Sequence, residues 1–378
     1  MITFCIPSKN NLRYLKTCIP SIEINSHYTT NEILVFVDQD NDGTVEWLEE
    51  NKIRYILNSE SECKGIGYAY DLMFKEAKFD LVVAFHADMI LGVDADKYLI
   101  EHYKPQSVVC STRIEPPLHP PGPEKIVQDF GLWPEEIKWD EFNQFVVKTS
   151  KENENKLTKS SFAPWLINRN DHLGHDPIFL SVFEDADLFR RFKLAGYDTI
   201  QVWSSLVYHL TCRGGQFEHA KETKDLNNKS QDWQLKNQIS LLEYIRKWGG
   251  IFQEYGPCEP KPNKKYDIGI KIINCDTSLV SLEPYFNNLT VDCNVIPYIE
   301  TFQPISKFDL HSKFVNELNN DVIIEFDNKL GDIQNLNYII KNIEDIMDQV
   351  EEDSEYEFGT VKIKVNKIEV KNPKLKLI

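Results

Sequence analysis

The chain has 378 residues, and 59 Asp and Glu against 42 Lys and Arg give it a formal net charge of −17 at pH 7. This balance argues against a nucleic-acid partner, because phosphate binding needs clustered basic side chains. No apolar run approaches the ~20 residues that span a bilayer, and a strand pattern begins at once, leaving no room for a signal peptide. The eight cysteines are scattered without a CxxC pair and give no sign of a structural zinc site. We therefore expect a cytoplasmic globular protein with reduced cysteines.

Strand and helix patterns alternate over the first 90 residues. Strands are predicted at 2–6, 33–37, 53–57 and 81–85, and helices at 12–24, 45–50 and 68–77. Further strand patterns follow at 107–115, 162–167, 199–203 and 207–209, and a helix at 233–244. This alternation predicts right-handed βαβ crossovers and an α/β fold with a mostly parallel sheet.

The stretch from Val82 to Asp88 is the most informative of these strands. It is a short apolar run typical of a buried parallel strand, and it ends in His86 and Asp88. Ligands of open α/β sheets bind beyond the carboxyl ends of the strands. His86 and Asp88 are thus candidates for a metal or phosphate site; the alternative is a surface Asp that starts a turn.

The loop after the second strand fits a calcium-binding pattern. Asp38 to Gly43, followed by Glu49, matches D-x-D-x-D-G-x5-E. An EF-hand, however, enters its loop from a helix, and here the entering segment 33–37 reads as a strand. We favour Asp38 as a strand-end carboxylate that faces the ligand crevice.

A second informative block begins near residue 181. Ser181 and Glu184 form an S-x-x-E capping box, which predicts a helix that Gly196 ends. Asp185 falls in the first turn, where the helix dipole favours its ionised form, and a carboxylate held ionised at a crevice can act as a general base. The alternative is dipole complementation without chemistry.

Three regions are predicted along the chain. Residues 1–256 form the first domain, which contains a proline- and aromatic-rich insertion at about 116–160 that we expect to shape a substrate site. Residues 257–265 are a linker by composition. Residues 266–378 form a smaller α/β domain of unknown role, with strands at 268–273, 322–326 and 361–370 and helices at 307–318 and 333–350.

With both blocks in view, residues 1 to about 250 resemble the family 2 glycosyltransferases, which have the GT-A fold. The resemblance rests on several motifs in order: 6–10, Asp38 with 42–44, Lys64-Gly65-Ile66-Gly67, His86-Ala87-Asp88 in the place of the DxD motif, Glu184-Asp185 with its helix, His209, and 247–249. Each motif is a weak signal alone, and the resemblance rests on their occurrence in this order.

The resemblance implies an inverting transfer of a sugar from a nucleotide-diphosphate sugar, UDP by default, to a hydroxyl of a glycan, lipid-linked, protein or other acceptor. Asp88 would bind Mn²⁺ or Mg²⁺ together with His209, and Asp185, beside Glu184, would be the general base. The residues implied at the nucleotide and its phosphates are Pro7, Ser8, Asp38, Lys64, Gly65, Gly67, His86 and Arg213.

One departure from the family pattern is His86, which stands at the first position of the DxD motif. Imidazole prefers softer metals than a carboxylate does, so either Asp88 alone anchors the cation or His86 helps to select Mn²⁺; His86 could also contact the ribose or pack in the core. The competing functions are a nucleotide-sugar pyrophosphorylase, whose glycine-rich loop is missing after the first strand, and a non-catalytic nucleotide-sugar-binding or scaffold protein.

Overall fold

The computed structural model describes residues 1–119, 121–179, 182–211, 230–256, 258–275, 279–331, 333–373 and 375. The chain forms two compact units. The first comprises 1–236, 254–261 and 375–378, and the second comprises 237–253 and 262–374. This division differs from the predicted boundary at residue 256, because residues 237–253 pack with the second unit.

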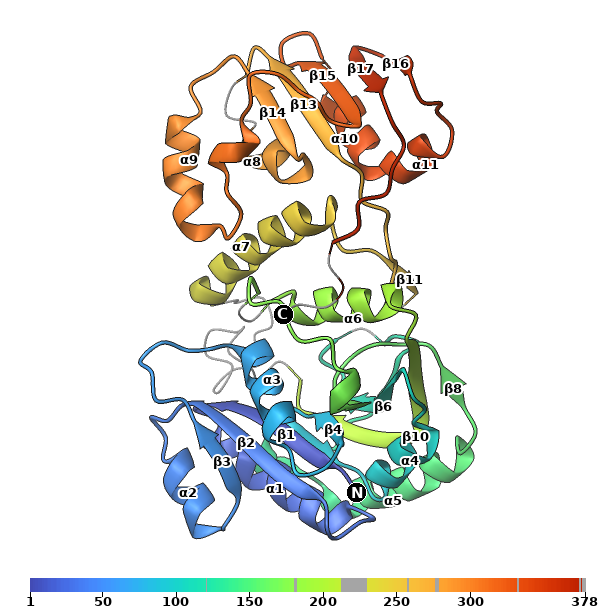
Figure 1. Ribbon diagram of the computed structural model, residues 1–378. Helices are drawn as coiled ribbons and strands as arrows, with labels where there is room; N and C mark the ends of the chain where they lie inside the picture. The colour runs from blue at the N-terminus through green and yellow to red at the C-terminus, as the bar shows by residue number, and fades with distance from the viewer. Residues whose placement is uncertain are drawn as a thin grey trace. The chain divides into compact units, whose positions relative to one another are not determined.

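The first unit is built on one large sheet, coloured blue to yellow-green in Figure 1. Along the sheet the strands run in the order β3 (Arg54–Leu57), β2 (Glu32–Gln39), β1 (Thr3–Lys9), β4 (Leu81–Ala84), β9 (Trp165–Asn168), β6 (Ser107–Glu115), β10 (Asp198–His209) and β5 (Met89–Leu91). The short strands β7 (Lys125–Val127) and β8 (Leu157–Thr158) pair with β6 and β10. Strands β3, β2, β1 and β4 are parallel, as are β6 and β10, whereas β9 runs antiparallel to both of its neighbours. The prediction of a mostly parallel sheet is confirmed.

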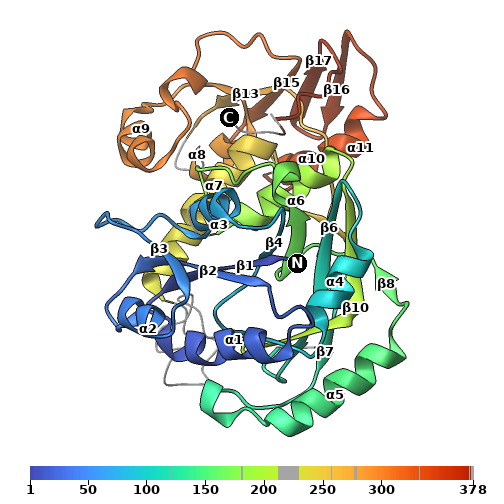
Figure 2. The same cartoon turned by 60° about the horizontal axis from the view of Figure 1, so that its bottom comes forward.

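Helices cover both faces of this sheet. In Figure 2, α1 (Leu12–Asn25), α4 (Ala95–His102) and α5 (Trp139–Glu152) lie on one side, and α3 (Ile66–Glu76) and α6 (Glu184–Leu194) lie on the other. Alternate strand residues point to opposite faces, so Phe4 and Val83 join one apolar cluster and Cys5 and Val82 join the other. The strands are apolar on both faces for this reason. A further short helix, α2 (Thr44–Glu50), links β2 to β3.

The second unit holds a five-stranded sheet of order β14 (Asn288–Val291), β13 (Ile268–Ile273), β15 (Val322–Asp327), β17 (Val361–Val365) and β16 (Ser354–Phe358). The first three strands are parallel, and the β16–β17 hairpin is antiparallel. Its helices are α8 (Leu279–Leu282), α9 (Ile296–Phe302), α10 (Ile333–Lys341) and α11 (Ile343–Met347), with the C-terminal part of α7 (Gln231–Trp248).

The predicted helix at 307–318 is wrong. Residues 307–318 hold one short 3₁₀ turn, His311–Lys313, and another, Gln303–Ile305, precedes them. Side chains bind the backbone here: Ser306 Oγ accepts a hydrogen bond from Phe308 N, and Gln303 Oε1 accepts one from Leu310 N. Such local bonds compete with helix hydrogen bonds, which accounts for the difference.

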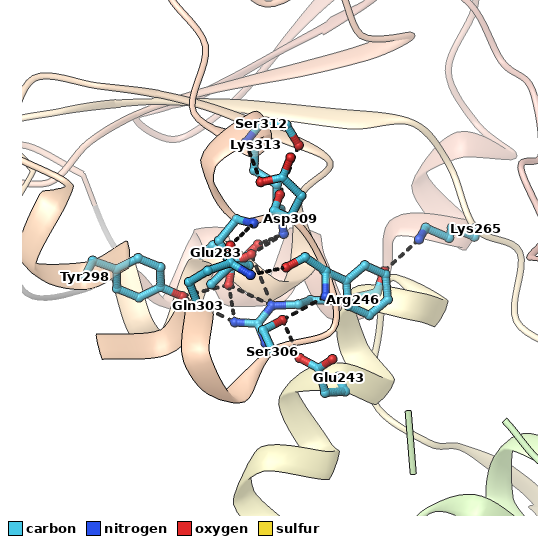
Figure 3. Close-up of polar contacts among 12 residues, drawn as sticks. Glu243, Arg246, Lys265, Glu283, Tyr298, Gln303, Ser306, Asp309, Ser312 and Lys313 are labelled. Carbon is cyan, nitrogen blue, oxygen red and sulfur yellow. Dashed lines mark hydrogen bonds and ion pairs between the residues drawn. The ribbon is translucent and has the colours of Figure 1, made fainter. Parts of the chain in front are cut away.

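A buried ion network explains why residues 237–253 belong to the second unit. Arg246 of α7 donates to Glu243 at 2.7 Å and to Glu283 at 2.6 Å, and Tyr298 also donates to Glu283 (Figure 3). Lys313 completes the network on Glu283. Because buried charges need partners, α7 is tied to this unit through Glu243 and Arg246.

Candidate active site

The site begins where β4 ends. His86 and Asp88 follow β4 directly, and the register of the sheet brings His209 to them: β10 runs antiparallel to β5, with His209 opposite Met89. Leu210 N donates to Asp88 O at 3.0 Å, and His209 Nε2 lies 3.6 Å from Asp88 Oδ2. The ligand atoms of His86, Asp88 and His209 all lie within 4.8 Å of one another. Three residues far apart in the sequence thus form one potential metal-binding group.

Glu115 stands behind His209. It ends β6, which pairs with β10 so that Ile114 lies opposite Tyr208. Glu115 Oε1 lies 2.9 Å from His209 Nδ1, and Lys125 Nζ donates to Oε2 at 2.9 Å. Glu115 was not among the predicted site residues, although its place at the end of the predicted strand 107–115 was a usable signal.

The charges of this group are set by burial and by close partners. Burial lowers the pKa of His86 to about 4, so its imidazole is neutral at pH 7. Burial also opposes the charge of His209, but Asp88 and Glu115 outweigh it and raise the pKa of His209 to about 9. Burial opposes ionisation of Asp88 as well, and His209 and His86 still hold its pKa below the usual value. Asp88 is therefore an ionised carboxylate between two imidazoles.

These residues fit a divalent cation. A histidine that binds a metal through one ring nitrogen commonly gives the other to a carboxylate, which fixes the ring. Glu115 holds Nδ1 of His209 in this way and leaves Nε2 directed at Asp88. When no cation is bound, His209 is protonated at pH 7. A cation that binds here would displace this proton.

A recess of about 290 Å³ lies at the carboxyl ends of β1 and β2. Its walls include four residues predicted for the nucleotide, Pro7, Ser8, Asp38 and Gly65, and also residues that the sequence analysis missed: Phe36, Cys63, Ile66 and Ala69. Ser8 is 2% exposed, and its Oγ has no hydrogen-bond partner in the described part of the chain. A buried hydroxyl without a partner on the wall of a recess is suited to a polar ligand.

Asp38 shapes one wall of this recess. Its carboxylate accepts hydrogen bonds from Lys64 N at 2.8 Å, Gly65 N at 3.2 Å and Asn58 Nδ2 at 3.0 Å. Gly65 has a φ of +83°, a conformation that side chains rarely adopt. Lys64 takes part through its amide, whereas its ammonium group pairs with Glu60.

The calcium alternative finds no support in the loop that follows Asp38. Asp40 accepts from the amides of Thr44 and Val45, and Asp42 accepts from the amide of Leu12 and the hydroxyl of Thr44. These carboxylates therefore accept hydrogen bonds from first-turn amides of α2 and α1, although the N-cap residues are Gly43 and Asn11.

Gly67 has a packing role. A β-carbon at this position would lie 2.8 Å from Cβ of His175, closer than real side chains allow. Glycine here lets the segment around His175 rest against the first turn of α3.

Glu184 and Asp185 lie at the start of α6. The predicted capping box is wrong, because Phe183 is the N-cap and Glu184 takes the first helical position rather than the third; Ser181 lies outside the described residues. Asp185 is exposed, and its Oδ1 accepts from Ala186 N at 2.7 Å. Glu184 Oε2 is buried without a hydrogen-bond partner among the described residues, and burial next to Asp185 raises the pKa of Glu184 to about 8. The pKa of Asp185 is raised as well, chiefly by desolvation, so the two carboxyls compete for one proton. Glu184 is the one that holds it, and the exposed Asp185 at the helix start is the one suited to accept a proton.

Tyr70 links the two halves of the site. Its hydroxyl donates to Phe85 O, next to His86, and its ring stacks on His175, which precedes α6. Burial raises the pKa of this hydroxyl well above its ordinary value. Arg213, predicted to contact the diphosphate, lies outside the described residues.

Comparison with known proteins supports one family. Residues 3–147 match the model of "Glycosyl transferase family 2", and no curated protein matches the chain. One similar solved structure is GalNAc-T7 with UDP, GalNAc and Mn²⁺, with 14% sequence identity and a TM-score of 0.42; the match covers 55% of this chain and 43% of that chain. Another is TarS 1–349 of S. aureus in complex with UDP, with 13% sequence identity and a TM-score of 0.37; the match covers 65% of this chain and 71% of that chain. The chain thus spans less than half of the GalNAc-T7 chain, and neither likeness is close enough to inform on the substrate. No helix in the described part of the chain has the length and apolar character that membrane crossing requires. The match to glycosyl transferase family 2 covers residues 3–147, which lie in the first unit and carry its β1, β2, β4 and β6 strands.

Proposed function

We propose that the chain transfers a sugar, with inversion, from a UDP-sugar to an acceptor hydroxyl with the help of a divalent cation. The observation that carries the proposal is the arrangement of His86, Asp88 and His209, backed by Glu115, at the sheet edge that also bears the recess lined by Ser8 and Asp38. Ligands of α/β sheets bind at this edge.

Each group has a distinct task in this reaction. The recess would hold the nucleotide, with the hydroxyl of Ser8 available to it. Asp88, His209 and, as a neutral imidazole, His86 would hold the cation. A cation there, Mn²⁺ or Mg²⁺, neutralises the charge that grows on the leaving diphosphate. Asp185 would take the proton of the attacking hydroxyl, while Glu184 stays protonated.

Hydrolysis of the donor tests the proposal without knowledge of the acceptor, since water can replace the acceptor hydroxyl. We expect release of UDP from one or more UDP-sugars in the presence of Mn²⁺. Asp185→Asn should lower the rate by about 10²–10⁴-fold, the usual contribution of a positioned base. Its affinity for UDP and Mn²⁺ should stay unchanged, because Asp185 lies outside the predicted nucleotide and cation sites.

Two results would contradict the proposal. Full activity of Asp185→Asn would exclude this residue as the base. Binding of UDP with no turnover of any UDP-sugar would favour the alternative, a non-catalytic nucleotide-sugar-binding protein.

A further inference from the structure

A second group of metal-ligating side chains lies where α3 meets the segment that precedes α6. Asp71 belongs to α3, and His172 and His175 belong to that segment. His172 Nε2 lies 2.7 Å and His175 Nδ1 lies 2.6 Å from the same atom, Asp71 Oδ1. The ligand atoms of all three residues lie within 4.8 Å of one another. None of them is part of the proposed transfer site.

The surroundings of this group are apolar and aromatic. The His172 ring stacks on Trp165 and meets the edge of Phe74, while Tyr70 stacks on His175. The side chains of His172 and His175 are 7% and 5% exposed, whereas that of Asp71 is 35% exposed. The two imidazoles are therefore sealed from water, and the carboxylate forms the open side.

The backbone already fixes the carboxylate. His175 N donates to both carboxylate oxygens of Asp71, to Oδ2 at 2.9 Å and to Oδ1 at 3.2 Å, and the two rings meet at Oδ1. Nδ1 of His172 is buried without a partner in the part of the chain that the structure describes, so Nε2 alone sets the direction of the ring. Two rings are thus directed at one carboxylate oxygen.

We propose that Asp71, His172 and His175 bind a zinc ion. Two imidazoles and one carboxylate are a common zinc ligand set, with water at the fourth position, and the exposed side of Asp71 provides access for that water. The ion would join α3 to the 172–175 segment, which already packs on Gly67. Cysteine spacing gives no sign of this site, because its ligands are histidine and aspartate.

The number of zinc ions that each chain retains tests this site directly. Since His86, Asp88 and His209 could also bind zinc, the background is the full chain with Asp88→Asn and His209→Gln. The protein is stripped with a chelator, loaded with zinc chloride, desalted and analysed by mass spectrometry of the metal. We expect one zinc ion per chain in this background and none after the further change Asp71→Asn, which keeps the size of the side chain.

Thermal unfolding provides a second readout. Added zinc should raise the unfolding temperature of the background protein and leave that of the Asp71→Asn variant unchanged; His172→Gln serves in the same way if Asp71→Asn does not fold. The proposal is overturned if the background protein retains no zinc, or if it retains the same amount after either substitution. In that case the three residues form a hydrogen-bonded anchor only.

Discussion

At the scale of single residues, the site depends on groups whose charge is set by their neighbours. Glu115 is the main example, since its carboxylate fixes one nitrogen of His209 and is itself held by Lys125. It would not touch substrate or cation, and we regard it as a positioning residue.

Replacing Glu115 should weaken cation binding. In Glu115→Gln the ring of His209 loses its charged partner, and we expect the affinity for Mn²⁺ to fall about 10–100-fold, the usual effect of removing a group that orients a metal-binding histidine. Calorimetric titration with Mn²⁺ measures this. The control is Glu135→Gln, an exposed carboxylate paired with Arg13, which should bind Mn²⁺ like the wild type. Equal affinity in Glu115→Gln and wild type would show that Glu115 does not position His209.

Glu184 should make the stability of the fold depend on pH. Its pKa is about 8 in the folded chain against an ordinary 4.5, so between these values the unfolded chain releases a proton that the folded chain keeps. The contribution of Glu184 is thus fully present below about pH 4.5 and is lost as the pH rises to about 8. Across this window, the unfolding temperature of wild type should fall relative to that of Glu184→Gln. Above it, the difference between the two unfolding temperatures should stay constant. Parallel curves throughout would mean that Glu184 titrates normally.

At the scale of elements, most of the first unit could be predicted from its sequence. The apolar runs of β1, β2, β4 and β6 and the apolar faces of α1 and α3 are strong local signals, and the structure confirms them. The strand β9 was predicted from the sequence, but its antiparallel direction was not predicted. The direction of a strand depends on partners that are distant in the chain.

Other parts of the site required the register of the sheet. His86 and Asp88 could be found by their place after a buried strand, whereas the contact between His209 and Glu115 depends on how β10 lies beside β6. The Asp71, His172 and His175 group joins positions about a hundred residues apart, and spacing alone gives no sign of it. In the second unit, side-chain bonds to the backbone overrode the helical pattern at 307–318.

The contact between α3 and the 172–175 segment should be sensitive to one methyl group. Gly67→Ala would place a β-carbon 2.8 Å from Cβ of His175, so we expect a loss of about 1–3 kcal/mol in the free energy of unfolding, typical of overpacking. Gly256→Ala, with nothing within 4 Å of the added carbon, is the matched control. Denaturant titration of both variants measures their free energies of unfolding. If Gly67→Ala is as stable as Gly256→Ala, the 172–175 segment moves aside at no cost.

At the scale of the whole molecule, the two units have different kinds of interior. In the first, two apolar clusters on opposite faces of one sheet support a polar edge that carries the site. In the second, an apolar core is accompanied by the buried network of Glu243, Arg246, Glu283 and Lys313. Breaking such a pair usually costs about 3–5 kcal/mol, because it leaves an unpaired buried charge. No residue of this network is part of the proposed transfer site.

The proposed transfer depends on Asp88, which should hold a cation that a nucleoside diphosphate needs for binding. Calorimetric titration of UDP into the full chain, with Mn²⁺ and with chelator, tests it most directly on wild type and Asp88→Ala. We expect UDP to bind wild type only when Mn²⁺ is present and not to bind Asp88→Ala. UDP binding of equal strength with chelator, or in Asp88→Ala with Mn²⁺, would contradict it.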